Sequence, residues 1–250
     1  MFCTQNASTS GRRLFSYTPA RCMKALDTDR PAPKSRQNNK AQVFYWDRVA
    51  AEKRFSHPLN AGWLKKYLNP QARMLDYGCG YGRTLGELSH AGFTNLAGAD
   101  FSEEMLARAR VEAPGCRLIR NDGSNLPFTN DCFDAMLLFA VLTCVPADEQ
   151  QRSLLAEAYR VLRPGGILYV SDLLINNDER NRERYQQYEL TYDPYGVFEL
   201  PEGVVVRHHQ REWIEQLLSP LKQLEWMDFT VTTMNGNESA AFQYLGRKRR

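Results

Sequence analysis

Short apolar runs alternate with amphipathic stretches along the chain from residue 73 to residue 172. A short apolar run is typical of a buried strand, whereas apolar positions three and four residues apart are typical of a helix lying on a sheet. The alternation predicts a parallel sheet with helices on both faces, the doubly wound arrangement. The predicted strands are Arg73–Tyr77, Asn95–Asp100, Arg117–Asn121, Phe133–Leu142 and Ile167–Asp172, and the predicted helices are Thr84–His90, the segment that Ser102 caps, and Asp148–Leu162.

The regions on either side extend this core. Apolar residues at helical spacing predict two helices within residues 41–69, and a third over Gln210–Leu218. Two strand-like segments, Leu224–Met234 and Ala241–Leu245, are joined by an Asn-Gly-Asn hairpin turn at 235–237. The predicted fold is therefore a doubly wound, Rossmann-like α/β sheet that is mostly parallel with an antiparallel last strand and has helices on both faces.

Three segments do not follow the alternation. Residues 1–40 lack hydrophobic periodicity and are rich in Ser, Thr, Asn, Arg and Pro, which predicts a disordered basic tail. A transit peptide is the alternative, since the segment has no acidic residue before Asp27 and is rich in arginine and serine. Residues 176–207 combine a polar start with tyrosines, prolines and glycines, and we interpret them as a lid-like insertion. The expected organisation is one domain over residues 41–246, followed by a basic tail at 247–250.

Charge and composition limit the classes of partner. The net charge of +3 is concentrated at the ends, because residues 1–40 carry eight Lys/Arg against two Asp and the last four residues are all basic. The body between them is acidic, with a net charge of −7, and an acidic body argues against a nucleic-acid partner. No apolar run approaches the ~18 residues that a membrane span needs.

The cysteines indicate the compartment. Six are present, and none forms a CxxC pair or has a metal-like spacing to histidine. We therefore expect no metal and a reducing compartment. The cytoplasm is the first expectation, and the mitochondrial matrix is the alternative if the first residues are a transit peptide.

A glycine-rich turn follows the first predicted strand. Asp76 ends the strand, and Gly78, Gly80 and Gly82 occupy alternate positions before the next helix. Glycine permits positive φ and lets a ligand approach the backbone closely, and the free N–H groups at a helix start suit a carboxylate or a phosphate. The turn alone leaves a dinucleotide, a phosphate or no ligand open. The G-x-G-x-x-G form of nicotinamide-binding folds is absent, because Arg83 stands at its third glycine position.

Several motifs in a fixed order narrow the choice of ligand for this turn. They are Leu75-Asp-Tyr-Gly-Cys-Gly-Tyr-Gly82, Gly98-Ala-Asp-Phe-Ser102, Asn121-Asp-Gly123 followed by Leu126-Pro-Phe128, Phe133-Asp134 and Leu162-Arg-Pro-Gly-Gly166. On these residues, the segment 41–246 resembles the class I S-adenosylmethionine-dependent methyltransferases, in particular the small-molecule branch known as methyltransferase type 11. The resemblance implies S-adenosylmethionine as the cofactor and a small molecule as the methyl acceptor.

The resemblance also implies roles for residues at the strand ends. Asp76 would hold the methionine amine, directly or through water. Asp100 would accept both ribose hydroxyls, since a carboxylate is a bidentate acceptor. The adenine would lie against Phe101 and Met105. The cofactor-binding residues implied are Asp76, Gly78, Gly80, Gly82, Asp100, Phe101, Met105, Asp122, Gly123 and Phe139.

Each of these acids also has a purely structural alternative. Asp76 and Asp122 could cap the next helix or turn, because short carboxylates accept local backbone N–H groups. For Asp100 this alternative is weaker, because Ser102 already stands at the predicted cap position. Asp122 would otherwise accept from the adenine amino group, beside the backbone of Gly123.

The implied reaction is an in-line displacement in which a nucleophile attacks the sulfonium methyl group. A general base is needed only when the acceptor arrives protonated, and no residue identifies itself as that base. The four histidines are interpreted as helix-end, capping or core residues. Candidate substrate contacts are Tyr45, Cys144, Tyr185, Tyr188, Tyr192 and Tyr195. Cys144 is interpreted as lining an apolar pocket rather than as catalytic, and the alternative for the four tyrosines of residues 176–207 is packing of the insertion onto the domain.

Two rival functions stay open at this point. One is an RNA or protein methyltransferase, and the other is a non-catalytic domain that binds the cofactor. The acidic body weighs against RNA, and the intact cofactor motifs weigh against a domain without activity. The expected oligomeric state is a monomer or a homodimer.

Overall fold

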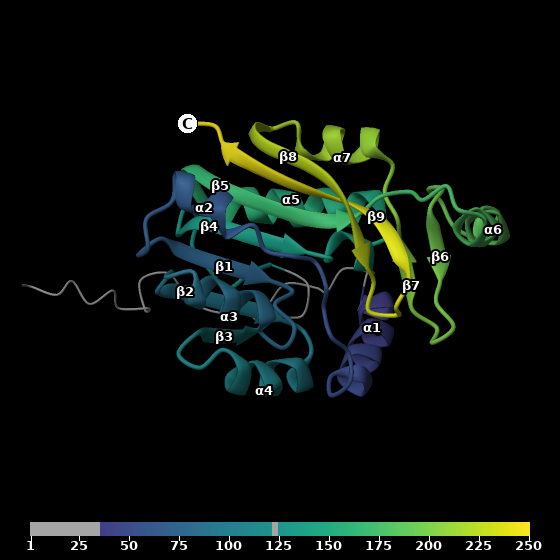
Figure 1. Ribbon diagram of the computed structural model, residues 1–250, viewed down its shortest axis with the longest axis horizontal. Coiled ribbons are helices and arrows are strands. Elements are labelled where there is room, and N and C mark those ends of the chain that lie inside the picture. Colours follow the sequence, from purple (N-terminus) through teal and green to yellow (C-terminus); the bar gives the residue numbers. More distant parts are fainter. Residues whose placement is uncertain (1–35, 122–124) are drawn as a thin grey trace, which may run out of the picture.

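The computed structural model describes residues 36–121 and 125–250, and within them one seven-stranded sheet forms the centre of the fold (Figure 1). The strand order is β3-β2-β1-β4-β5-β9-β8. Strands β1 to β5 are mutually parallel, and β9 is antiparallel to both of its neighbours, β5 and β8. The predicted fold class, mostly parallel with an antiparallel last strand, is confirmed.

The bounds of the core elements follow the predicted alternation. The strands are β1 Arg73–Tyr77, β2 Asn95–Asp100, β3 Arg117–Arg120, β4 Phe133–Phe139, β5 Leu162–Leu173, β8 Leu221–Thr232 and β9 Glu238–Lys248. The helices are α1 Arg36–Val49, α2 Ala61–Tyr67, α3 Arg83–His90, α4 Glu103–Glu112, α5 Asp148–Val161 and α7 Arg211–Leu218.

Alternate side chains of the central strands enter two hydrophobic cores. Met74 of β1 and Leu137 of β4 pack in the core that includes residues of α2, α3 and α4. Their neighbours Leu75 and Met136 pack in the opposite core, with residues of α5 and α7. Burial on both faces explains why these strands are continuous apolar runs, as expected for central parallel strands.

Strands β8 and β9 each begin three residues earlier than predicted, and two boundaries nearer the centre of the sheet are also wrong. Strand β4 ends at Phe139 rather than Leu142, because Ala140 has a φ of +54° and a 3-10 turn follows at Leu142–Cys144. An apolar run does not distinguish a buried strand from a buried turn. Strand β5 begins at Leu162, so residues 163–166 belong to it, with a register shift opposite β4, rather than forming a stop before a strand at Ile167.

The N-terminal helix is longer than predicted. Helix α1 begins at Arg36 and so extends into the segment assigned to the tail. The rest of that predicted tail, residues 1–35, lies outside the described residues, as does the interpretation of it as a transit peptide.

The segment interpreted as an insertion forms a lobe beside the carboxyl ends of the parallel strands (Figure 1). It contains helix α6 Glu179–Tyr188 and a two-stranded sheet of β6 Val197–Glu199 and β7 Val205–Arg207. We call residues 176–207 the insertion lobe. Tyr185 and Phe198 of the lobe pack with Tyr45 and Val49 of α1 in a separate hydrophobic cluster, so α1 and the lobe enclose the same edge of the sheet.

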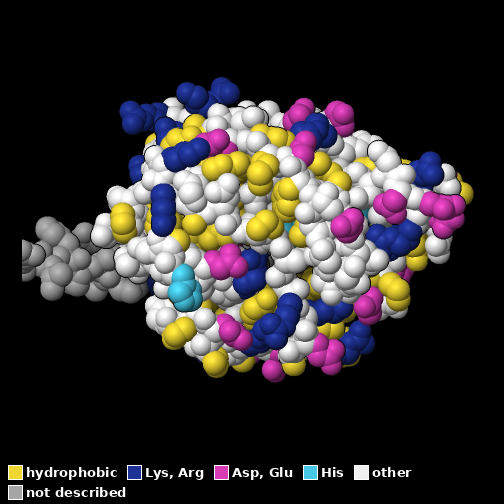
Figure 2. Space-filling view, in the orientation of Figure 1, with side chains coloured by type: hydrophobic (Ala, Val, Ile, Leu, Met, Phe, Trp, Pro, Cys, Tyr) yellow, Lys and Arg dark blue, Asp and Glu magenta, His cyan; other side chains and the backbone are white. Residues whose placement is uncertain are grey.

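Two further observations concern the distribution of surface charge and the length of the helices. On the face shown in Figure 2, Lys and Arg side chains are interspersed with Asp and Glu rather than gathered into one basic face over the sheet. None of the helices in the described ranges is long and apolar enough to cross a membrane.

Candidate functional site

The carboxyl ends of β1 and β2 bring the glycine-rich turn and Asp100 together. Gly78 and Cys79 both donate their backbone N–H groups to the carbonyl of Ala99, at 2.7 and 3.1 Å. The N–H of Gly80 donates to Oδ2 of Asp100 at 2.8 Å, and the N–H of Ser102 donates to Oδ1 at 2.9 Å. The turn is therefore held to the end of β2 by the carbonyl of Ala99 and by the side chain of Asp100.

Two glycines in this turn are required by geometry. Gly78 and Gly80 have φ values of +72° and +51°. A Cβ at Gly78 would lie 2.7 Å from a methyl group of Val141, and one at Gly80 would lie 2.1 Å from the ring of Phe55. The turn is thus closely covered from two directions, by the loop after β4 and by the segment before α2.

Asp76 is the second-last residue of β1, next to this turn, and one of its carboxylate oxygens has no hydrogen-bond partner among the described residues. Its side chain is buried, and Oδ2 makes no hydrogen bond to any residue that the structure describes. Burial raises the pKa of Asp76 to about 7, although the charge of Arg83 lowers it. A buried acceptor without a partner costs about 1–3 kcal/mol, so this oxygen suits a ligand that brings a donor, such as an amine. The alternative interpretation of Asp76 as a helix cap lacks a recorded hydrogen bond, because the N-cap position of α3 is Gly82.

Asp100 is buried too, yet its carboxylate is well solvated by protein groups. Burial raises its pKa, and the N–H groups of Ser102, Gly80 and Phe101 oppose that rise. Each carboxylate oxygen retains acceptor capacity beyond one bond. Ser102 accepts from the N–H of Met105 at 3.1 Å and so fills the predicted cap of α4.

The other implied cofactor residues are placed unevenly. Met105 is buried against Ala50 and Tyr81, while Phe101 is half-buried beside Asp100. Phe139 is half-buried at the end of β4 and packs edge-on against Tyr169, with ring centroids 4.8 Å apart. Asp122 and Gly123 lie outside the described residues.

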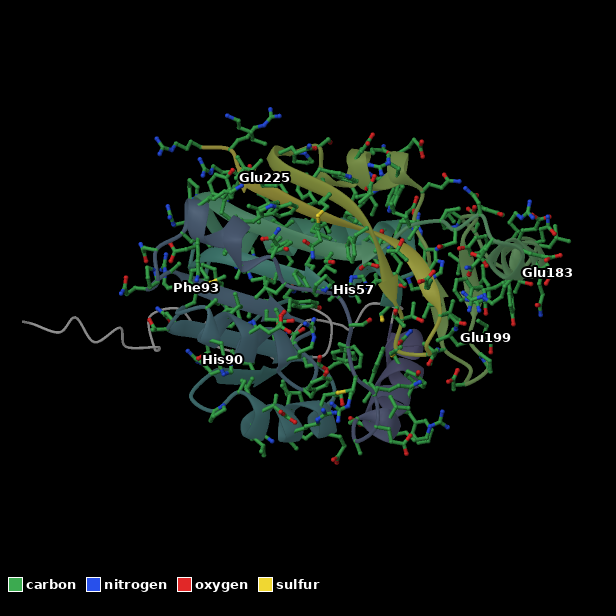
Figure 3. All side chains as sticks on the ribbon, in the orientation of Figure 1. His57, His90, Phe93, Glu183, Glu199 and Glu225 are labelled. Atoms are coloured by element: carbon green, nitrogen blue, oxygen red, sulfur yellow. The ribbon has the colours of Figure 1, made fainter. Side chains whose placement is uncertain are left out.

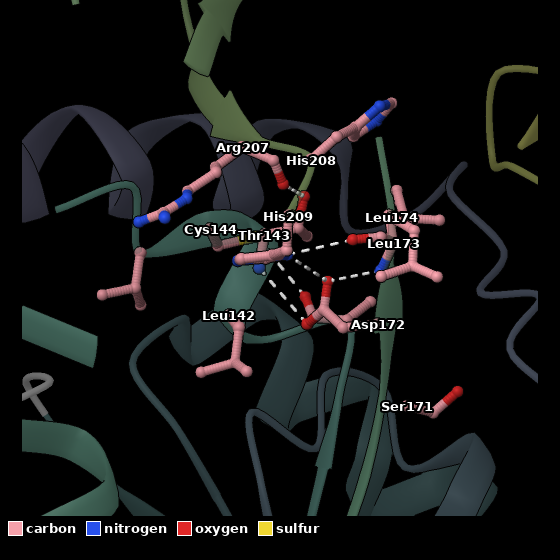
Figure 4. Close-up of polar contacts among 12 residues, drawn as sticks. Leu142, Thr143, Cys144, Ser171, Asp172, Leu173, Leu174, Arg207, His208 and His209 are labelled. Atoms are coloured by element: carbon pink, nitrogen blue, oxygen red, sulfur yellow. Dashed lines mark hydrogen bonds and ion pairs between the residues drawn. The ribbon is translucent and has the colours of Figure 1, made fainter. Parts of the chain in front are cut away.

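The loop after β4 is fixed by an acid that sequence reasoning missed. Asp172, fully buried near the end of β5, accepts from the N–H of Thr143 at 3.2 Å and from that of Leu173 at 2.8 Å (Figure 4). Burial raises the pKa of Asp172 to about 7. The signal was an acid near the end of a predicted strand, the same signal that singled out Asp76 and Asp100.

Cys144 ends the 3-10 turn in this loop. Its thiol donates to the carbonyl of Ala140 at 3.6 Å, and burial and the charges of Asp172 and Asp100 raise its pKa. Ala140 holds a positive φ, a conformation that costs of order 1–3 kcal/mol and is found most often at functional sites. The turn is therefore a strained element within electrostatic reach of Asp100.

Tyr45, on α1, packs against the insertion lobe. It is buried, and its hydroxyl makes no hydrogen bond to any described residue. Burial raises its pKa to about 12, with Glu202 and Cys144 adding to the rise. Tyr45 therefore keeps its proton at neutral pH and carries a buried polar atom without a partner.

The four tyrosines of the lobe separate into two kinds. Tyr185 is fully buried, and its hydroxyl lies 2.6 Å from Nδ1 of His208, which places it in the core of the lobe. Tyr188 and Tyr192 stack on each other with centroids 5.9 Å apart, and Tyr195 is partly exposed with its ring edge-on to Tyr185. The structure thus does not bring all four to one surface.

A second residue that sequence reasoning missed is His57. Its Nδ1 lies 2.9 Å from the hydroxyl of Ser171 on β5, and its ring is almost buried. It belongs to residues 51–60, which we call the N-terminal strap, and Figure 3 places it at the carboxyl ends of the central strands. Its sequence signal, a histidine before a proline in a helix break, suggested only a boundary.

The residues present fit the implied cofactor. Two carboxylates on adjacent strands offer hydrogen-bond acceptors, and one buried oxygen of Asp76 has no described partner. The glycines of the turn have no Cβ atoms, so a ligand can approach the backbone closely. No group of three or more His, Cys, Asp or Glu side chains in the described ranges could hold a metal ion.

Comparison with known proteins shows what the central part of this chain is similar to. Residues 75–170 match the model of a family described as a methyltransferase domain. The chain is 37% identical over 114 residues to the phthiotriol/phenolphthiotriol dimycocerosates methyltransferase of Mycobacterium tuberculosis, covering 42% of this chain and 39% of that protein. It is 30% identical over 154 residues to the malonyl-[acyl-carrier protein] O-methyltransferase of Pectobacterium atrosepticum, covering 59% and 58%.

A solved structure shows the same resemblance. The S-adenosylmethionine-dependent methyltransferase of Methanosarcina mazei superimposes with a TM-score of 0.70 at 25% identity, covering 75% of this chain and 97% of that one. The chain spans less than two thirds of the length of the two curated relatives named above. The comparisons bear out the predicted resemblance to S-adenosylmethionine-dependent methyltransferases.

Proposed function

We propose that this chain, whose core belongs to the S-adenosylmethionine-dependent methyltransferase family, transfers a methyl group from that cofactor to a small organic acceptor. The observation that carries the proposal is the pair of buried carboxylates, Asp76 and Asp100, at the ends of adjacent strands around the glycine turn. One of their oxygens lacks any described partner, and an amine-bearing ligand would supply it.

The residues around the turn would hold the cofactor by its polar groups. Asp76 would bind the methionine amine through Oδ2, and Asp100 would accept the ribose hydroxyls while keeping its bonds to Gly80 and Ser102. Phe101, beside Asp100, is placed to cover adenine. Met105 would contribute packing beneath this surface rather than an open contact.

The cofactor supplies an activated methyl group on a sulfonium. Because the leaving group is already activated, the protein acts chiefly by positioning and by excluding water. The strap contributes to this exclusion, since Phe55 lies against Gly80 and stacks on Tyr81 with ring centroids 5.0 Å apart. The strained loop at Ala140 supports the facing side of the site.

The acceptor would bind between the loop after β4, helix α1 and the insertion lobe. The two relatives named above carry names that describe different acceptors, phthiotriol or phenolphthiotriol dimycocerosates and malonyl-[acyl-carrier protein]. The unpartnered hydroxyl of Tyr45 and the thiol of Cys144 are our candidates for polar contacts to the acceptor. Tyr188, Tyr192 and Tyr195 are the candidate aromatic contacts, while Tyr185 would support the lobe.

The setting of the protein is also part of this proposal. The four described cysteines are free thiols, which suits a reducing compartment, and the cytoplasm is the compartment we propose. A small-molecule acceptor needs no partner chain, and a monomer or a homodimer suffices for the site as built.

Incubation with S-adenosylmethionine labelled in its methyl group and a metabolite extract, followed by mass spectrometry, tests the proposal. We expect a labelled small molecule to appear and to be absent when the Asp100→Asn variant is used. Label in RNA or protein with none in small molecules would favour the rival methyltransferase class. No transfer at all, with cofactor binding intact, would favour a non-catalytic domain.

A further inference from the structure

His57 lies at the carboxyl ends of the central strands, close to the proposed cofactor turn. Its ring contacts Ser171 on β5, and Ser171 is paired in register with Phe139, the last residue of β4. The loop that follows β4 touches the glycine turn, because Val141 lies against Gly78. One strand, β4, therefore separates the strand that His57 contacts from the strand that leads into the glycine turn, and both end at the same edge of the sheet (Figure 3).

The strap holds His57 there from both sides. The guanidinium of Arg83 donates to the carbonyl of His57 at 2.6 Å, and Gln243 of β9 donates to that of Pro58. Two residues further on, the N–H of Asn60 donates to the hydroxyl of Tyr169 on β5 at 3.1 Å. Bonds to three separate elements fix the ring position, as a site that orients a reacting group requires.

One nitrogen of the ring is tied and the other is not. Nδ1 lies 2.9 Å from the hydroxyl of Ser171, whereas Nε2 makes no hydrogen bond to any residue in the described ranges and is not a fully buried atom. The ring edge is also flanked by Phe229 of β8, at 6.1 Å between centroids. Nε2 is thus the polar atom that the strap leaves for a ligand.

The charge environment keeps the imidazole neutral. Burial and the charge of Arg83 lower the pKa of His57 to about 4. Among the described groups that pack on it from α3, β5 and β8, Arg83 is the charged one, and Ser171 and Phe229 are neutral. The ring is therefore uncharged at physiological pH, and its free nitrogen is a hydrogen-bond acceptor before the reaction begins.

We propose that His57 is a catalytic residue of this site, whose Nε2 takes the proton of a hydroxyl or amine acceptor as that acceptor is methylated. The inference rests on the proposed function. It assigns Nδ1–H as the donor to Ser171, which fixes the tautomer that leaves Nε2 free to accept. It also gives the class of acceptor, one that carries an O–H or N–H group at the attacking atom.

The proton and electron balance is complete. The lone pair of the acceptor oxygen or nitrogen forms the new bond to the methyl carbon, and the bond from that carbon to sulfur breaks with its electrons on sulfur. The acceptor proton passes to Nε2 of His57 and then to water, and the products are the methylated acceptor and S-adenosylhomocysteine. No oxidant or reductant is needed.

The test compares wild type with His57→Gln and Ser171→Ala, and uses His90→Gln as a matched control. His90 is exposed at the end of α3, away from His57 (Figure 3). The probe is methyl-labelled S-adenosylmethionine with a metabolite extract, followed by the acceptor that wild type labels. General acid–base catalysis contributes typically about 10²–10⁴-fold, so we expect His57→Gln to lose at least about 10²-fold in rate. His90→Gln should retain it, and calorimetry should find unchanged cofactor affinity in both.

Two further readouts separate catalysis from structure. The rate of His57→Gln should rise about tenfold per pH unit, as direct ionisation of the acceptor replaces the missing base. A ¹H–¹⁵N spectrum of labelled histidine should show His57 protonated at Nδ1 in wild type and altered in Ser171→Ala. A wild-type enzyme that methylates nothing would remove the proposed function. If wild type transfers the methyl group, three results would each overturn the role of His57 without affecting the proposed function. They are full activity in His57→Gln, a rate of His57→Gln that does not recover at alkaline pH, and a wild-type His57 protonated at Nε2.

Discussion

Asp76 and Asp100 end neighbouring strands, yet their surroundings give them different chemistry. Asp100 accepts two backbone N–H groups that favour its charged form, whereas Asp76 keeps a buried oxygen with no described partner. The carboxylate of Asp100 is therefore already stabilised by the protein, whereas that of Asp76 needs a cation from a ligand. This difference is visible only in the structure, because the sequence shows an acid at each strand end.

The raised pKa of Asp76 predicts a pH-dependent cofactor affinity. Free Asp76 titrates at about 7, and a bound amine would lower that pKa, so binding releases a proton while Asp76 is protonated. Affinity should therefore rise between about pH 5.5 and 7. Calorimetry in buffers of different ionisation enthalpy measures the proton release. Asp76→Asn should bind more weakly and lose the pH dependence, and an unchanged dependence would contradict the assignment.

The close cover of Gly80 makes a second prediction at this scale. Gly80→Ala forces a Cβ into the ring of Phe55, whereas Gly92→Ala, also at positive φ, meets nothing within 4 Å. Both variants carry backbone strain of about 1 kcal/mol, so their difference isolates the contact. We expect Gly80→Ala to be at least about 1 kcal/mol less stable than Gly92→Ala in urea, and only Gly80→Ala to weaken cofactor binding. Equal stability and equal binding would count against the covered turn.

The elements that end at the carboxyl edge are joined by buried acids rather than by surface ion pairs. Asp172 of β5 holds the backbone of the loop after β4, and Asp100 of β2 holds the glycine turn. Each bond links a loop to a neighbouring strand, so the loops that form the site are fixed by the sheet. His57 extends the pattern to the strap through Ser171.

Burial of Asp172 predicts how stability changes with pH. Its folded pKa of about 7 lies above the unfolded value of 3.8, so the folded state binds more protons between these values and Asp172 destabilises as pH rises through them. Its contribution to the slope reaches about 1.4 kcal/mol per pH unit. The lowered pKa values of His57, His208 and His209 act in the opposite direction below pH 6.5, so the prediction concerns the difference between two proteins.

The Asp172→Asn variant loses one hydrogen bond to the backbone, and it also loses the carboxyl group that titrates. Its deficit in unfolding free energy relative to wild type should shrink as pH rises from about 5 to 8. The exposed Asp228→Asn serves as the control and should show a constant difference. Urea unfolding at several pH values measures both. A constant deficit for Asp172→Asn would show that Asp172 does not titrate in this window.

Much of the fold could be predicted from the sequence, and the failures have physical causes. Strands β1 and β2 were predicted to their last residues, because buried parallel strands are short apolar runs, and an acid stands at or next to the last residue of each. Strand β4 was predicted too long, because a buried 3-10 turn is as apolar as a strand. His57 was missed as a site residue because its contacts, to β5 and α3, are all distant in the chain.

At the scale of the whole molecule, three separate segments converge on one edge of the sheet. The strap directly follows helix α1, whereas the insertion lobe is far from both in the sequence, and α1 and the lobe share one hydrophobic cluster. The site is thus enclosed by additions to the domain rather than by the sheet itself. Specificity for an acceptor would reside in these additions, which the family match at residues 75–170 does not cover.

The two kinds of tyrosine in the lobe should behave differently. Tyr185→Phe removes a buried hydroxyl bonded to His208 and should destabilise the protein by about 1–2 kcal/mol. Tyr192→Phe removes a more exposed hydroxyl whose bond to Glu199 is 3.5 Å, and should leave stability unchanged. Thermal unfolding compares them. If Tyr192→Ala lowers turnover but spares cofactor affinity, a substrate contact is supported, while equal losses of both would indicate packing alone.

The central claim, an S-adenosylmethionine site built on Asp76 and Asp100, is tested most directly by calorimetric titration of the protein with that cofactor. The account predicts saturable binding at one site per chain in wild type, and a loss of at least about tenfold, or 1.4 kcal/mol, in Asp100→Asn. Asp228→Asn, far from the turn and on the surface, should bind as wild type does. Equal affinity in Asp100→Asn and wild type, or no binding by wild type, would contradict the claim.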